Sequence, residues 1–565
     1  MKVFSPKFFE CMKTYNKEQF VKDLIAGIIV AIIALPLSIA LAIASGVGPE
    51  RGIFTAIIAG FVISFLGGSK VNISGPTAAF ATIVAGIVVE FGMSGLIVAT
   101  IMAGIMLIIM GICRLGALIK FIPYTITTGF TAGIAVTIVI GQIKDFLGLT
   151  YAEGTVAIET MEKLEAVGHS ITTFNPQALI VGIIALVILF GWPKINKKIP
   201  SSLIAVLVGI VIVKVGGLDV NTIGDLYVIP KGLPALEVPN VDFAMISKLL
   251  PSAFTIAILA AIESLLSCVV SDGMVDAKER HNSNTELIAQ GVGNMLSGMF
   301  GGIPATGAIA RTAANVNNGG RTPLAGMIHA AILFVILMFL MPFAEWIPMP
   351  VIAAILFQVA YNMCGWKKFR RIVKDAPKMD IAVLLVTFAL TVVFDLVVAI
   401  EVGMILAVVL FMKRMADVTH IRTWTQYDEA ATVDGGRLKN IPEKTAVYEI
   451  EGPMFFATAD KIDFPIRPGI KVMILRMRNV PSLDVSAIRP LRTIFEVCEK
   501  EGVHMLISHA NEQPFRMMEK DGLVDDIGRD NYLPNIDEAL ARAREIVEKN
   551  IPVDPNRPKS GKHDI

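Results

Sequence analysis

Residues 301–326 of this 565-residue chain read GGIPATGAIARTAANVNNGGRTPLAG, and this stretch indicates how the chain folds. It places Arg311 among small residues, with long uncharged runs on both sides. An arginine within a bilayer is costly unless it faces a cavity, a carboxylate or an anion. Residues 304–308, PATGA, suit an extended segment that turns into a helix start, whose backbone N–H groups attract anions. The stretch therefore predicts a binding site inside a membrane domain.

A second stretch with the same layout lies far upstream at residues 67–85, GGSKVNISGPTAAFATIVA. It too has a glycine pair, a short segment with β-branched residues, a proline and then an alanine-rich run. Hydrophobic segments interrupted by glycine and proline, at matching positions of two halves, mark the substrate site of transporters. We therefore expect two facing half-helices whose N-termini converge on one substrate.

The composition places the chain among membrane proteins and excludes several classes of function. Hydrophobic residues make up 54% and charged residues 18%, whereas soluble domains carry about 25% charged residues. The net charge of +1 gives no basis for nucleic-acid binding. The five cysteines have no metal-ligand or disulfide spacing, so we expect no metal and no cofactor. Motifs for nucleotide binding or hydrolysis are absent from the sequence, so we expect a secondary transporter and not an enzyme.

Runs without charge predict about fourteen transmembrane helices, seven in each half of residues 24–415. An odd number per half makes the two repeats, about 24–216 and 249–413, inverted relative to each other. The predicted runs of the first half are 24–49, 52–69, 71–89, 91–113, 121–143, 176–193 and 199–213. Those of the second half are 249–271, 287–310, 312–320, 322–344, 350–364, 381–394 and 396–412.

Loop charges predict the orientation of these helices. Lysine and arginine gather in alternate loops, as at residues 367–371, and the loops at 151–170 and 217–243 are acidic or neutral. Because basic loops stay inside, we expect the N-terminal segment, residues 1–23, to be cytoplasmic. That segment has no apolar core of a signal peptide. The expected location is a cell membrane, in contact with its lipids.

The chain after residue 415 has the composition of a soluble α/β domain. We expect a linker at 416–444, the domain at 445–550 and a disordered, proline-rich tail at 551–565. The predicted strands are 446–452, 472–477 and 503–508, and the predicted helices are 486–502 and 539–550.

Several motifs in this order resemble the SulP family, which are anion transporters of the sulfate-permease type with a C-terminal STAS domain. The motifs are AGIIVAIIALPLSIALAIASG (26–46), GPTAAF (75–80), IESLL (262–266), AIARTAANV (308–316) and VFDLVVAIEVG (393–403). SGPTAAF and QIKDFLGL (142–149) further resemble the bacterial aerobic four-carbon dicarboxylate (succinate) members, although Pro304, Gly307 and Glu401 depart from them. The resemblance implies a homodimer in the bacterial inner membrane and a cytoplasmic protein partner for the STAS domain.

Glu263 is the candidate coupling residue, because it lies in an otherwise uncharged run. The resemblance implies that this position couples transport to an ion: a glutamate suggests a proton, whereas bicarbonate members pair an aspartate with sodium. We assign Ser267, one turn further, to the same site. The alternatives are that Glu263 forms a structural pair with Arg311, and that the serine bonds its own helix backbone.

We assign the anion to backbone N–H groups at the two half-helix starts and to one arginine side chain. These residues are Thr77, Ala78, Ala79, Gly307, Ala308, Ile309 and Arg311. For Ala78 and Ala79 the alternative is close helix packing, which small residues also serve in membranes.

In the soluble domain, Ser486 in VPSLDVSAIRPL resembles a phosphorylatable serine of STAS-type regulators, and the alternative is that Asp484 or Ser486 only caps a helix.

The predicted function is proton-coupled uptake of a dicarboxylate or sulfate. Sodium-coupled bicarbonate transport and a membrane-anchored STAS signalling scaffold remain the alternatives.

Overall fold

The chain forms two compact units in the computed structural model, Met1–Ile405 and Leu406–Ile565. The structure describes residues 4–117, 123–152, 157, 159–196, 199–227, 235–236, 239, 243–275, 280–394, 396–425, 432–433, 436–437, 441–461, 464 and 466–553. The expected disordered tail, 551–565, lies outside this range from residue 554 onward.

The first half of the membrane unit contains a helix at each predicted run. The helices are α2 (Lys17–Ala44), α3 (Pro49–Leu66), α4 (Ala81–Ile112), α5 (Tyr124–Leu147), α7 (Pro176–Ile195) and α8 (Ser201–Gly216). α4 covers two predicted runs. Gly92 divides it between them with a φ of 65°, a value that glycine adopts without strain. The predicted seven segments are therefore present.

The second half repeats this arrangement. Its helices are α10 (Phe243–Met274), α11 (Ser283–Met299), α12 (Ile309–Asn317), α13 (Leu324–Ala344), α14 (Met349–Cys364), α16 (Lys378–Val393) and α17 (Leu396–Val418). Among the described residues, seven helices of the membrane unit are long and apolar enough to cross a membrane by length and composition. Short helices precede or connect the longer ones: α1 (Lys7–Met12), α6 (Thr160–Ser170), α9 (Ile223–Leu226) and α15 (Trp366–Asp375).

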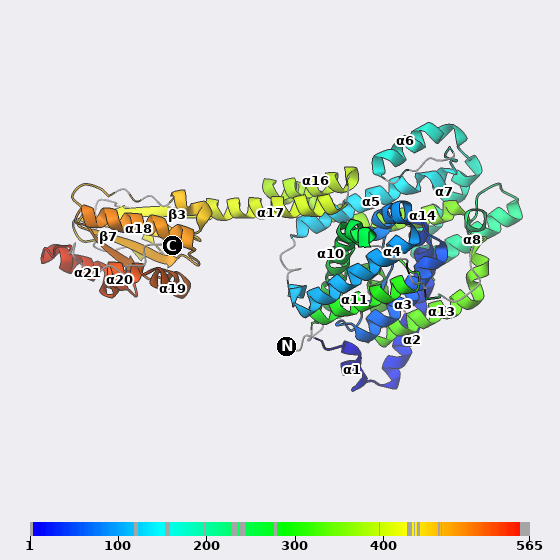
Figure 1. Ribbon diagram of the computed structural model, residues 1–565, viewed down its shortest axis with the longest axis horizontal. Helices are drawn as coiled ribbons and strands as arrows, with labels where there is room; N and C mark the ends of the chain where they lie inside the picture. Colours follow the sequence, from blue (N-terminus) through cyan, green and yellow to red (C-terminus); the bar gives the residue numbers. More distant parts are fainter. Residues whose placement is uncertain are drawn as a thin grey trace. The chain divides into compact units, whose positions relative to one another are not determined.

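The helices pack as two groups (Figure 1). The first group consists of α2, α3, α4, α10, α11, α12 and α13, with α11 packed against α3 and α4. The second group consists of α5, α7, α8, α14 and α16, with α5 packed against α14 and α16. The two half-helix segments belong to the first group.

The two glycine-rich stretches meet in the middle of the first group. β1 (Ser74–Gly75) pairs antiparallel with β2 (Thr306–Gly307), with Ser74 opposite Gly307. β1 leads into the 3₁₀ turn η1 (Ala78–Phe80) and α4, and β2 leads into α12. We call this paired region the crossing. Segments 232 residues apart thus bring two helix starts together.

The second unit has a five-stranded sheet in the order β3-β6-β7-β8-β9. Its strands are β3 (His420–Thr425), β6 (Thr445–Glu451), β7 (Val472–Asn479), β8 (His504–Ser508) and β9 (Tyr532–Leu533). β3 is antiparallel to β6, and the other pairs are parallel. One apolar core lies under α18 (Val485–Lys500), α19 (Glu512–Asp521) and α20 (Leu523–Ile527), and another lies under α21 (Ile536–Glu548). The predicted α/β layout agrees with this sheet.

Two boundaries differ from the sequence prediction. α2 begins at Lys17, inside the expected N-terminal segment, because the Asn16 side chain caps it by accepting the Gln19 N–H at 2.8 Å. The segment expected as a linker, 416–444, contains β3, which pairs with β6 along its whole length, and a short hairpin of β4 (Thr432–Val433) and β5 (Gly436–Arg437). The sequence did not indicate this strand because it contains charged residues. An edge strand of a sheet often carries such residues.

Candidate functional site

Glu263 lies on α10 beside the start of the first half-helix. The Thr77 hydroxyl donates a hydrogen bond to Glu263 Oε2 at 3.0 Å. Thr77 immediately precedes the helical residue Ala78, so the carboxylate sits at a helix N-terminus, where backbone N–H groups favour negative charge. The structure thus brings together two residues predicted from separate parts of the sequence.

Arg311 reaches from α12 towards the other segment of the crossing. Its side chain is 1% exposed, and Nη2 donates to the carbonyl oxygen of Pro76 at 3.1 Å and to Ser38 Oγ at 3.5 Å. Nε and Nη1 have no hydrogen-bond partner among the described residues. A Cβ on Gly75 would stand 2.2 Å from Nη1, so only glycine lets the guanidinium approach so closely.

The alternative of a structural pair between Glu263 and Arg311 is not found among the ion pairs of the described residues. The arginine is held by a carbonyl and a serine instead. Buried guanidinium N–H groups without partners cost free energy unless another group accepts from them. Arg311 therefore keeps donors that suit an anion at the crossing.

The residues assigned to the anion all lie at or beside the two helix starts, but not all of them have a free backbone N–H group. The Ala308 N–H donates to the carbonyl of Ile73 at 2.8 Å and so takes part in the crossing itself. Ala78 and Ala79 are buried, and Ile309 is 40% exposed at the first position of α12. A Cβ on Gly307 would meet the Asn72 side chain at 2.6 Å.

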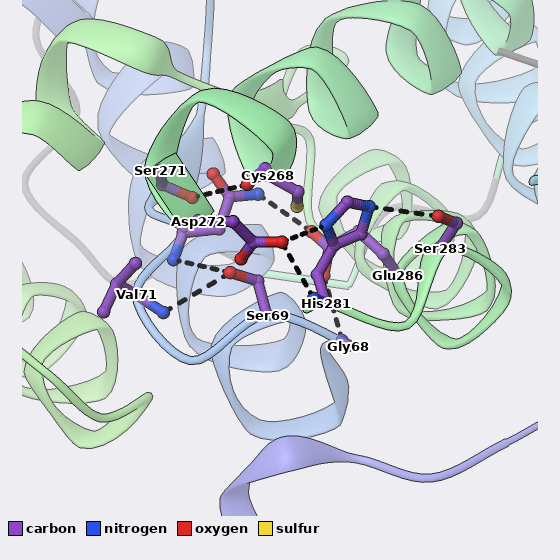
Figure 2. A network of polar contacts seen from close by, with 10 residues as sticks. Gly68, Ser69, Val71, Cys268, Ser271, Asp272, His281, Ser283 and Glu286 are labelled. Atoms are coloured by element: carbon purple, nitrogen blue, oxygen red, sulfur yellow. Dashed lines mark hydrogen bonds and ion pairs between the residues drawn. The ribbon is translucent and has the colours of Figure 1, made fainter. Parts of the chain in front are cut away.

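A second carboxylate, Glu286 on α11, accepts buried hydrogen bonds from several elements beside the crossing. Figure 2 shows it near Gly68. Its Oε2 accepts the Gly68 N–H at 2.9 Å. Its Oε1 accepts from Asn72 Nδ2 at 2.9 Å and from Ser264 Oγ and Gln290 Nε2, each at 3.2 Å. The side chain is therefore saturated with donors, and it joins the first segment of the crossing to α10 and α11.

Asn72 extends this network to the second half-helix. Its Oδ1 accepts from Ser267 Oγ at 2.7 Å and from Thr312 Oγ1 at 3.0 Å. We call the residues Asn72, Ser264, Ser267, Glu286, Gln290 and Thr312 the hub. Ser267, predicted as a coupling residue, is thus placed in the hub, where it bonds side chains of other elements and not its own helix.

The extended segment before α12 is fixed by further polar side chains. Asn294 accepts the Ala305 N–H at 2.8 Å and donates to its carbonyl at 2.9 Å. Thr55 Oγ1 accepts the Ile303 N–H at 2.7 Å. These bonds satisfy backbone groups that neither a helix nor a sheet pairs.

The sequence reasoning missed Glu286, Gln290 and Asn294. A signal was present, because these residues recur every four positions along one face of α11. Asn72 carried a weaker signal, because a single asparagine in a glycine-rich segment usually indicates a turn.

In the second unit, Asp484 caps α18: its Oδ1 accepts the Ala487 N–H at 2.9 Å. Ser486 is exposed in the first turn of the helix, and its phosphorylation stays a prediction. Among the described residues, no group of three or more His, Cys, Asp or Glu side chains is placed to hold a metal ion.

Comparison with known proteins agrees with this arrangement over nearly the whole chain. The sulfate permease family matches residues 20–387, and the STAS domain matches residues 438–542. The chain is 39% identical over 548 residues to the "Putative sulfate transporter YvdB" of Bacillus subtilis, covering 95% of this chain and 99% of that protein. It is 31% identical to the bicarbonate transporter BicA of Picosynechococcus, covering 94% and 96%.

The solved structure of the murine anion transporter Slc26a9 in the inward-facing state shares the fold, with a TM-score of 0.85 at 18% identity over 95% of this chain and 94% of that one. The helical membrane domain and the C-terminal STAS domain predicted from the motifs are therefore confirmed. The relatives named here are transporters and not enzymes, as predicted. The dicarboxylate resemblance is not among these relatives, whose names refer to sulfate and bicarbonate. The chain belongs to the sulfate permease family of anion transporters and carries its STAS domain.

Proposed function

We propose that this chain is a secondary active transporter that takes up a divalent oxyanion together with a proton, with sulfate as the first candidate substrate. The observation that carries the proposal is the buried Arg311 side chain with Nε and Nη1 unpartnered among the described residues. A guanidinium offers paired N–H donors that match the oxygen atoms of sulfate or a carboxylate. The helix starts on both sides of the crossing add favourable dipoles.

Glu263 is the proposed proton carrier. Its one hydrogen bond from the described residues comes from a hydroxyl, Thr77, which can bond either the charged or the neutral carboxyl group. A carboxyl group held this way can gain and lose a proton without breaking a network. Uptake of a proton with a divalent anion also lowers the charge that crosses the membrane.

Two other substrates deserve testing beside sulfate. Bicarbonate with sodium is the second candidate, since the bicarbonate transporter BicA is 31% identical over nearly its whole length. A four-carbon dicarboxylate is the third, because the motif resemblance favours it. The positive charge and the paired N–H donors of Arg311 suit all three anions.

A substrate panel in proteoliposomes tests the proposal. The purified full-length chain would be assayed for uptake of labelled sulfate, bicarbonate and succinate under an inward proton gradient, with sodium present or replaced by choline. We expect sulfate accumulation that needs the proton gradient and not sodium. Accumulation of bicarbonate alone, and only with sodium, would select the second candidate. The Arg311→Ala variant serves as the control for transport through this site.

We further propose that the N-terminus and the STAS domain face the cytoplasm of a bacterial cell, that the chain forms a homodimer and that the STAS domain binds a cytoplasmic protein. The basic loop clusters support the orientation. Cysteine labelling from either side of intact cells at exposed Lys374→Cys on α15 tests it, and labelling only after permeabilisation is the expected result.

A further inference from the structure

A polar cavity of about 570 Å³ lies beside the N-terminal helix α1, at one end of the first helix group. Its walls come from α1, the start of α2, the loop before β1, the end of α10, residues 280–281 before α11 and the loop between α12 and α13. Among its described lining residues, none belongs to the second helix group, and Thr77, Glu263 and Arg311 do not line it. The cavity is therefore separate from the crossing and from the surface between the helix groups.

Basic side chains outnumber acidic ones in the described part of this cavity. Lys7, Lys70, Arg280 and Arg321 line it, against Glu10 and Asp272. This excess of positive charge favours an anion.

Both carboxylates already have donors. Lys7 Nζ lies 2.6 Å from Glu10, and Lys70 Nζ lies 3.6 Å from it. Asp272 Oδ2 accepts two bonds from His281, from the backbone N–H at 2.9 Å and from Nδ1 at 2.7 Å (Figure 2). Among the described residues, neither carboxylate forms an ion pair with Arg280 or Arg321. Arg321 Nη1 donates to the carbonyls of Val316 at 2.7 Å and Gly320 at 2.8 Å, which hold the guanidinium at the cavity.

The wall of the cavity is also fixed to the hub. Gly68, which lines the cavity, donates its N–H to Glu286 at 2.9 Å, and its carbonyl accepts the Asn282 N–H at 2.9 Å. The neighbouring Gly67 carbonyl accepts the Lys7 N–H at 2.9 Å. A ligand in the cavity would thus contact α1 and a loop that the hub holds in place.

We propose that this cavity binds a small phosphate-bearing anion, either a soluble phosphate compound or a lipid headgroup. Arginine and lysine are the side chains that recognise phosphate oxygens most often, the arginine through its planar fork. The volume lies in the range of small-molecule sites, about 300–1,000 Å³. Bound there, the anion joins α1 to the loops before β1 and before α13, and so stabilises the first helix group.

Thermal unfolding of the full-length chain in nanodiscs tests this site. Inorganic pyrophosphate would be titrated in phosphatidylcholine nanodiscs, and a second arm would use phosphatidylglycerol nanodiscs without pyrophosphate. The test variant is Arg280→Gln with Arg321→Gln. The matched control is Arg370→Gln with Arg371→Gln, which removes the same charge from exposed positions of α15.

We expect pyrophosphate or the anionic lipid to raise the unfolding midpoint of the wild type and the control, and the test variant to need at least about tenfold more ligand. The arm that responds identifies the source of the phosphate group. Arg311→Ala should respond like the wild type, so this result does not depend on the proposed transport. A wild type that responds to neither ligand, or a test variant that responds fully, would overturn the site. If the double variant does not fold, Arg280→Gln alone, at an exposed position, gives the same comparison.

Discussion

Two glutamates on neighbouring helices of the first group are held in opposite ways. Glu286 on α11 is 1% exposed and accepts four hydrogen bonds, including one from the backbone of Gly68. Glu263 on α10 accepts one described hydrogen bond, from the Thr77 hydroxyl. A carboxylate saturated with donors fixes its surroundings, and one with a single exchangeable partner can change its state. We call Glu263 and Arg311, the two charged residues of the proposed transport site, the working site. The comparison distinguishes the working site from the hub, whose Ser264 directly follows Glu263.

The largest effect is expected from Glu263→Gln, because the amide cannot take up a proton. Substrate should still bind, since Thr77 can donate to the amide oxygen and Arg311 is unchanged. Accumulation driven by a proton gradient should vanish, whereas substrate exchange between the two sides persists and no longer varies with pH. Uptake and exchange assays in the same proteoliposomes measure both. Uphill accumulation with the wild-type pH dependence would show that the proton moves elsewhere.

Arg311→Lys tests the other half of the working site. Lysine keeps the charge but loses the planar pair of donors. Losing charge-assisted hydrogen bonds of about 1.5–3 kcal/mol should weaken substrate affinity by about 10–150-fold. Equilibrium binding of labelled substrate measures the change, with exposed Arg370→Lys on α15 as the control. Unchanged affinity would mean that the substrate does not touch this side chain.

Glu286→Gln should act on stability. The new NH₂ group would face donors from the backbone and from Asn72, Ser264 and Gln290, so at least one hydrogen bond becomes a repulsion. We expect a loss of more than about 2 kcal/mol, seen as a lower unfolding midpoint. The same substitution at Glu263 is the matched control and should cost less than about 1 kcal/mol. Equal losses would remove the distinction between hub and working site.

The residues of the proposed working site are easier to recognise in the sequence than those of the hub, for a physical reason. Glu263 and Arg311 stand out because each is an isolated charge in an apolar run. Burying such a charge in a membrane costs free energy, so it usually indicates a function. Glu286 stands near the start of its helix, four residues after Asn282, where an acidic residue normally serves the helix dipole. Its burial depends on contacts with Gly68 and Asn72, more than 200 residues away, which no local pattern contains. The positions of the two half-helices could therefore be predicted from the sequence, but the residues that contact them could not.

Gly75 and Gly307 lie on opposite strands of the crossing. We expect substitutions at Gly75 to affect the working site and substitutions at Gly307 to affect the hub. An added Cβ at Gly75 would stand 2.2 Å from Arg311 Nη1, the end of a long side chain that can shift. At Gly307 it would stand 2.6 Å from Asn72 Nδ2 and 3.1 Å from the Ser264 backbone, both within the hub. Gly75→Ala should weaken substrate binding several-fold with little loss of stability. Gly307→Ala should lower the free energy of unfolding by about 1–3 kcal/mol through overpacking, which is measured as a lower unfolding midpoint. The reverse pattern in binding and melting assays would exchange the two assignments.

The smallest effect is expected from Ser267→Ala, which tests whether this residue belongs to the hub or to ion coupling. Ser267 lies one turn after Glu263 on α10, but its hydroxyl donates to Asn72 Oδ1 at 2.7 Å and lies 3.3 Å from Thr312 Oγ1. Its removal leaves Asn72 Oδ1 with the Thr312 donor at 3.0 Å, so the loss should be about 1 kcal/mol of stability with coupling unchanged. Ser264→Ala, also a hub hydroxyl on α10, is the matched control and should behave alike. Ser267→Ala alone changing the proton or sodium requirement of uptake would instead place its hydroxyl in the coupling site and extend the working site into the hub.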